Sequence, residues 1–120
     1  MPARPKPQDF IPLKPDAFYV LLVLLHGELH GYALMREASL HSEGRVELQA
    51  GALYRLLARL LDEGLVAEAQ RRSAPDADDQ RRRYYRITTL GRHVIAAEAE
   101  RMTALAEAAQ RALKLHHALA

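Results

Sequence analysis

The chain has 120 residues, of which 49% are hydrophobic, enough for one compact domain and too few for two ordinary ones. Its formal net charge is only +2, so total charge is weak support for a polyanionic partner, and the distribution of the charge must decide. Cysteine is absent, which excludes disulfides, thiol catalysis and cysteine-rich zinc sites.

The N-terminal residues 1–15 carry five of the six prolines, which remove backbone donors and disfavour helix. They predict a flexible, extended arm, whose Arg4, Lys6 and Lys14 are candidates for nonspecific phosphate contacts. A first helix is expected over residues 17–26, capped by Asp16 and ended by Gly27. A second, amphipathic helix is expected within residues 27–42.

A third helix is predicted within residues 48–64, because apolar side chains recur there at helical spacing and Gly64 supplies a stop. Four leucines form its apolar stripe: Leu53, Leu56, Leu57 and Leu60. At 100° per residue, the opposite face is small, basic and aromatic. It comprises Gly51, Tyr54, Arg55, Ala58 and Arg59.

After Gly64 the periodicity changes to that of strands, weakly in residues 65–71 and clearly in residues 83–88. The second segment places Tyr85 and Ile87 on one side and Tyr84 and Arg86 on the other. We therefore expect a hairpin with a long tip. Its two arms carry five arginines: Arg71, Arg72, Arg81, Arg82 and Arg83.

The last element is predicted to be one long helix that starts after a Thr88 cap and continues to the end of the chain. The order is then three short helices, a hairpin and a long helix. This order is that of a mainly α winged helix-turn-helix domain over residues 16–89, followed by a dimerisation helix over residues 90–120.

In such a domain the third helix enters the major groove of double-stranded DNA and the hairpin reaches the flanking backbone or the minor groove. Gly51 and Ala58 would permit close approach, and Arg55 could reach guanine edges. Tyr54, Arg59 and the five hairpin arginines would then contact phosphates or a narrow minor groove. The alternatives are a solvated charged loop and an ordinary amphipathic helix with a polar outer face.

Three stretches of the sequence resemble, in the same order, the signature segments of the PadR family of bacterial transcriptional regulators. They are "ELHGYALMREA" at residues 28–38, "GALYRLLARLLDEGLV" at 51–66 and "RRRYYRITTLGRHVI" at 81–95. The resemblance implies a dimeric DNA-binding repressor of the short type, with a single C-terminal helix that crosses to the partner subunit. Two departures concern the operator: Ala52 stands where the family usually has a hydroxyl residue, and Arg55 where it often has proline.

The C-terminal helix shows apolar residues at alternating four and three spacing, a seam typical of helix pairing. A helix of about 30 residues is roughly 45 Å long and would extend past so small a core, which favours a partner subunit over packing on its own domain. A two-fold homodimer predicts a roughly palindromic operator. The residues expected at the dimer interface are Phe18, Leu22, Ile95, Ala99, Met102, Ala106, Ala109 and Leu113.

No catalytic residues, metal site or cofactor are predicted, because there is no glycine-rich phosphate loop and no acid and base pair in a recognisable arrangement. Without a signal-peptide pattern or a bilayer-length apolar run, we expect a cytoplasmic protein with no membrane partner. The rival function is a winged-helix protein-interaction module without specific DNA binding. The resemblance also allows a small aromatic effector, in a space that Phe18, Tyr19 and Met102 could line, although plain core is the favoured role of these residues.

Overall fold

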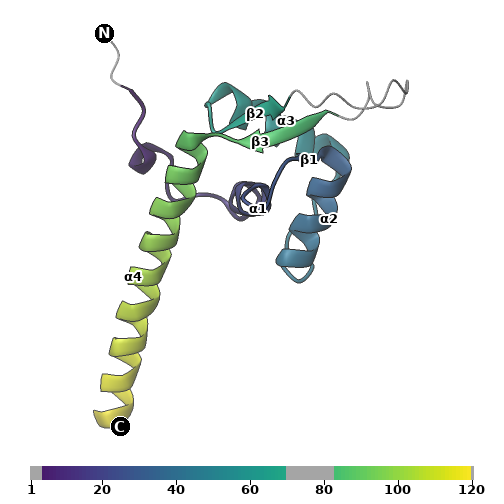
Figure 1. Ribbon diagram of the computed structural model, residues 1–120. Helices are drawn as coiled ribbons and strands as arrows, with labels where there is room; N and C mark the ends of the chain where they lie inside the picture. Colours follow the sequence, from purple (N-terminus) through teal and green to yellow (C-terminus); the bar gives the residue numbers. More distant parts are fainter. Residues whose placement is uncertain (1–3, 70–82, 120) are drawn as a thin grey trace.

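The computed structural model describes residues 4–69 and 83–119. The fold is mainly helical, with a small antiparallel sheet and a long last helix that extends away from the rest of the domain (Figure 1). This arrangement confirms the predicted winged helix-turn-helix fold class. In chain order the elements are a 3-10 helix η1 (Pro7–Phe10), α1 (Pro15–Leu24), β1 (Leu29–His30), α2 (Gly31–His41), α3 (Ala50–Asp62), β2 (Val66–Ala69), β3 (Tyr84–Ile87) and α4 (Thr89–Leu119).

Helix α1 starts one residue before the predicted cap. Pro15 occupies its first position, where the missing N–H would have no helical acceptor in any case, and Lys14 is the N-cap residue. Asp16 therefore lies within the first turn, where its Oδ1 accepts a hydrogen bond from the Ala17 N–H at 2.7 Å. Gly27 follows the helix with a φ of 144°, a backbone conformation that favours glycine and supports the predicted stop.

Helix α2 begins later than expected, because the residues before it join the sheet. Leu29 pairs with Tyr85 and His30 with Tyr84 in antiparallel register, so the sheet has three strands in the order β1-β3-β2. His30 then caps α2, with its Nδ1 accepting from the Ala33 N–H at 3.3 Å.

The predicted hairpin is present as β2 and β3, which pair in antiparallel register from Val66 opposite Ile87. Tyr85 and Ile87 are buried against the core, and Arg86 is exposed on the other face, as the alternation predicts. The tip between the strands, residues 70–82, lies outside the described residues.

The core lies where α1, α2, α3, the sheet and the start of α4 meet. All four leucines of the predicted α3 stripe are buried, at 6% exposure or less. Thr88 caps α4 as predicted: its Oγ1 accepts from the Gly91 N–H at 3.0 Å and donates to the Gly64 carbonyl at 2.6 Å. Glu98 is the last buried residue of α4, and residues 102–119 are exposed.

The predicted flexible arm of residues 1–15 is described from residue 4 onward. In this part η1 packs on α4, and Phe10, Ile11 and Leu13 are partly buried against the core. The Leu13 N–H also donates to Oε2 of Glu98 at 2.6 Å. The prolines prevent a long helix, but burial of the apolar side chains between them stabilises the packing of this segment on the domain.

Candidate nucleic-acid interface

The exposed face of α3 is the one that the sequence predicts. Because the leucine stripe is buried, the opposite side of the helix faces outward, with Gly51, Arg55 and Ala58 exposed along it. Tyr54 is 49% exposed and the Arg59 side chain 51%. Within residues 4–69 and 83–119, the Arg55 side chain has no hydrogen-bond or ion-pair partner, so its guanidinium is available to a ligand.

Tyr54 lies against the start of α2, and glycine at position 31 makes room for it. A Cβ on Gly31 would lie 2.7 Å from the Tyr54 hydroxyl oxygen, far closer than such contacts normally come. The pairing holds the phenol beside the first turn of α2, whose backbone N–H groups favour anions. This flank of α3 thus combines a hydroxyl donor with a helix N-terminus.

Aromatic residues connect this flank to the sheet, and the sequence reasoning did not count them as site residues. The His30 ring lies edge-on to Tyr84, with centroids 5.5 Å apart, and stacks with Tyr32 at 6.5 Å. Tyr32 is 68% exposed, which is unusual for so large an aromatic side chain. The signal in the sequence was the family resemblance, whose segments at residues 28–38 and 81–95 contain these three side chains.

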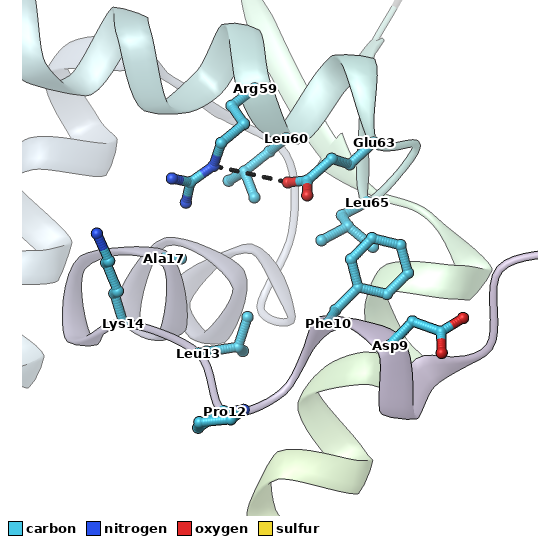
Figure 2. Close-up of a pocket in the computed structure, with 10 residues that line it drawn as sticks. All are labelled: Asp9, Phe10, Pro12, Leu13, Lys14, Ala17, Arg59, Leu60, Glu63 and Leu65. Atoms are coloured by element: carbon cyan, nitrogen blue, oxygen red, sulfur yellow. Dashed lines mark ion pairs between the residues drawn. The ribbon is translucent and has the colours of Figure 1, made fainter.

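On the other flank of α3, Arg59 is held by an ion pair, its Nε lying 3.6 Å from Oε1 of Glu63. It lines an open pocket of about 260 Å³ together with N-terminal residues that include Phe10, Leu13 and Lys14 (Figure 2). Sequence reasoning placed Arg59 correctly on the outer face, but it did not predict that the N-terminal segment lies beside it.

Of the five hairpin arginines, only Arg83 falls within the described residues; Arg71, Arg72, Arg81 and Arg82 lie outside them. Arg83 precedes β3, and its Nη1 lies 3.4 Å from Oε1 of Glu68 on β2. The side chain is 70% exposed, and an exposed pair of this kind contributes at most about 1 kcal/mol. Arg83 can therefore exchange Glu68 for a phosphate at little cost.

The sequence profile of the "Transcriptional regulator PadR-like family" matches residues 20–97, which is more than half of the chain. The protein belongs to the PadR-like family of transcriptional regulators. The matched range runs from α1 through the first turns of α4, and so includes both flanks of α3 and the sheet.

Solved structures share the fold of this PadR-like regulator. H. salinarum RosR matches with a TM-score of 0.65 and 22% identity, over 93% of this chain and all of that one. A PadR family transcription regulator from Clostridium difficile matches with a TM-score of 0.65 and 16% identity, over 83% of this chain and 99% of that one. A transcriptional regulator from Clostridium thermocellum matches with a TM-score of 0.61 and 20% identity, over 87% of this chain and 93% of that one. No curated protein matches the chain significantly.

The predicted dimer residues of this PadR-like regulator fall into three groups. Ile95 is 5% exposed and belongs to the core of its own chain, and Phe18 and Leu22 are half-buried at its edge. The remaining five residues of the predicted seam are exposed on α4: Ala99, Met102, Ala106, Ala109 and Leu113. The accessible part of the seam therefore starts after Glu98.

A second pocket, of about 380 Å³, lies between α1 and α4 and includes Phe18, Tyr19 and Met102, the three residues expected around an effector. No group of three or more histidine or acidic side chains in the described part of the chain is arranged to hold a metal ion. None of the described helices is both long enough and apolar enough to cross a bilayer.

Proposed function

We propose that this PadR-like regulator binds double-stranded DNA sequence-specifically by placing α3 in the major groove. The observation that carries the proposal is Arg55, which has no side-chain partner among the described residues and lies between Gly51 and Ala58 on the exposed face of α3. A major groove about 12 Å wide admits a helix, and small residues let its backbone approach the base edges. Arginine can donate two parallel hydrogen bonds to guanine O6 and N7, which gives Arg55 a base-reading role.

The flanking side chains support phosphate contacts that fix the register of α3. Tyr54 supplies a hydroxyl on one flank of α3 and Arg59 a guanidinium on the other, while the exposed Arg83 supplies a second guanidinium at the start of β3. Such contacts provide affinity without sequence information. On this proposal residues 16–89 form the DNA-binding unit, and Arg71, Arg72, Arg81 and Arg82 add phosphate contacts from the hairpin.

We further propose that the protein acts as a homodimer through α4. Residues 102–119 are exposed along a helix of 31 residues, and large apolar side chains among them are not covered by any described part of the chain. Five of them are at least 43% exposed: Met102, Leu105, Leu113, Leu115 and Leu119. A two-fold partner would cover this face and present two α3 helices to a roughly palindromic operator, where the bound dimer would act as a repressor.

Release by a small aromatic ligand is part of the proposal, because the α1–α4 pocket adjoins the dimer seam at Met102. A ligand there would alter how α4 sits on α1, and with it the spacing of the two α3 helices. Transcription in vitro from a promoter that carries the operator, with and without a panel of small aromatic acids, tests both repression and release.

The test of DNA binding compares an operator duplex with a random duplex at several salt concentrations. Arg55→Ala should cost roughly 1 to 3 kcal/mol on the operator and much less on random DNA, since it removes base readout. Replacing Arg81, Arg82 and Arg83 together should weaken binding to both duplexes. It should also make the slope of log affinity against log salt less steep by up to about three per subunit. Arg111→Ala, on exposed α4, is the matched control.

Equal losses on both duplexes for Arg55→Ala would refute readout through that residue. If the wild type shows no preference for the operator over random DNA at any salt concentration, the protein is instead the interaction module without specific DNA binding.

A further inference from the structure

The N-terminal strap, defined here as residues 6–14, is fastened to α4 by a buried carboxylate. Glu98 is 1% exposed, and its Oε2 accepts the Leu13 N–H at 2.6 Å while its Oε1 accepts from Nε of Arg101. The Arg101 hydrogen bond, followed by the Leu13 N–H, lowers the pKa of Glu98 against the opposing effect of burial. Separating the strap from α4 would leave a buried charge short of a donor, which is costly.

The end of the strap brings Lys14 to the side of α3. Lys14 lines the same pocket as Arg59, together with Phe10 and Leu13 of the strap. In Figure 2, Lys14 and the terminal nitrogens of Arg59 lie on one side of the pocket, and Glu63 and Asp9 lie on the other.

The acidic groups of this pocket have partners that leave Lys14 and the terminal nitrogens of Arg59 without an ion pair in the described residues. Glu63 pairs with Nε of Arg59, so the two terminal nitrogens of that guanidinium remain. Asp9 accepts the backbone N–H of Lys6 at 2.9 Å through Oδ2. No ion pair joins Lys14 to any acidic side chain in the part of the chain that the structure describes.

The position of Arg59 around α3 indicates what the pair of cations would meet. Tyr54 and Arg59 are five residues apart, which is about 140° around a helix, so they lie on opposite sides of the face centred on Arg55 and Ala58. A helix lying in the major groove has one phosphate backbone along each of its sides. One flank of α3 has Tyr54 beside the start of α2, and the opposite flank has Arg59 beside Lys14.

We propose that Lys14 and Arg59 together bind one DNA backbone phosphate on this flank, and that Glu98 is the positioning residue that keeps the strap, and so Lys14, in place. The inference rests on the proposed DNA binding and adds to it a contact from the N-terminal strap. It also separates Lys14 from Arg4 and Lys6, whose side chains do not line the pocket. An ammonium and a guanidinium on one phosphate provide affinity and salt dependence, and no base readout.

The test measures binding of the full chain to operator and random duplexes between 50 and 200 mM salt. Lys14→Gln should weaken binding to both, with a slope of log affinity against log salt that is less steep by about 0.9 per subunit. The affinity ratio of wild type to variant should then shrink by about 3.5-fold per subunit across this range. Lys14→Arg should retain the wild-type slope, and so should Lys114→Gln, the matched control on exposed α4.

Glu98→Gln tests the positioning role, because glutamine keeps the shape but removes the charge that strengthens the hydrogen bond from Leu13, and its NH2 group cannot accept from Arg101. It should reduce affinity and slope in the wild-type background and change neither when Lys14 is already glutamine. An equal loss in both backgrounds would mean that Glu98 acts only on stability. Arg101→Gln, which weakens the same carboxylate contact at the surface, replaces Glu98→Gln if that variant does not fold.

The outcomes keep this inference separate from the proposed function. If the wild type does not bind DNA, DNA binding itself is wrong. If the wild type binds and Lys14→Gln keeps the full slope, only the contact from the strap is wrong. Inorganic phosphate is the second probe: binding that requires Lys14 and that duplex DNA does not displace would assign the two cations to free phosphate and overturn the DNA contact.

Discussion

Replacing Gly91 with alanine tests how closely α4 approaches the sheet. Gly91 is buried in the first turn of α4, and a Cβ there would lie 2.2 Å from the Leu65 carbonyl oxygen and 2.7 Å from Cγ1 of Ile87. The carbonyl cannot move aside easily, because it already accepts the Thr88 N–H at 3.1 Å. The added methyl group must therefore displace backbone on one side or the other.

Overpacking of this kind costs typically 1 to 3 kcal/mol, and a clash with backbone belongs at the upper end. Alanine is more favourable than glycine in a helix by about 0.5 to 1 kcal/mol, which offsets part of this cost. The free energy of unfolding should therefore fall by about 2 kcal/mol. For a chain of this length the unfolding entropy converts that loss to a fall in melting temperature of about 8 °C.

The assay is thermal unfolding followed by circular dichroism at a fixed protein concentration, since self-association would shift the midpoint. Gly51→Ala is the control: it also lies in the first turn of a helix, but its Cβ would meet only the Arg55 terminal nitrogen at 3.4 Å, at the end of a flexible side chain. We expect that variant to melt within about 3 °C of the wild type. A Gly91→Ala protein that melts at or above the wild-type temperature would refute the close approach.

Acid should destabilise the wild type more than Glu98→Gln, because folding lowers the pKa of Glu98. The resulting stabilisation is complete above the pKa of an ordinary glutamate, roughly 4.3, and is lost as the pH falls through the lower pKa of the folded state. Denaturant unfolding from pH 7 to pH 3 measures this, and parallel curves for the two proteins would contradict it. Gly31→Ala should displace Tyr54 with little change in stability, since the half-exposed ring can move outward, yet weaken DNA binding several-fold in gel shifts. Deleting residues 103–120, of which 103–119 are exposed, should yield a folded monomer in light scattering, and a truncated protein that stays dimeric would argue against pairing through α4.

Features that depend on neighbours along the chain were predictable. The leucine stripe of α3 follows from a period of 3.6 residues, which any helix turns into one apolar face. The Thr88 cap follows from a hydroxyl placed just before the first turn of α4. The alternation of Tyr85 and Ile87 with Arg86 likewise indicated which side of β3 is buried. These patterns also placed Arg55 on the outer face of α3.

Features that depend on distant partners were not predictable. Two residues, Leu29 and His30, become a strand only because β3 supplies their hydrogen-bonding partners from much later in the chain. The proline content of the N-terminal segment predicted flexibility, whereas Phe10, Ile11 and Leu13 find an apolar surface on other elements.

The burial of Glu98 could not be predicted from the residues near it in the sequence. In an alanine-rich helix a glutamate is ordinarily a solvated surface residue, and nothing within four residues except Arg101 suggests otherwise. It is buried because the Leu13 N–H, 85 residues away, supplies a hydrogen bond that water would otherwise provide. Periodicity and caps are set by interactions within a turn or two, so the sequence by itself determined the helices, the hairpin and the exposed face of α3. The strand β1, the attachment of the strap to α4 and the pocket that Lys14 shares with Arg59 were decided by the tertiary structure, because each needs groups that only folding brings together.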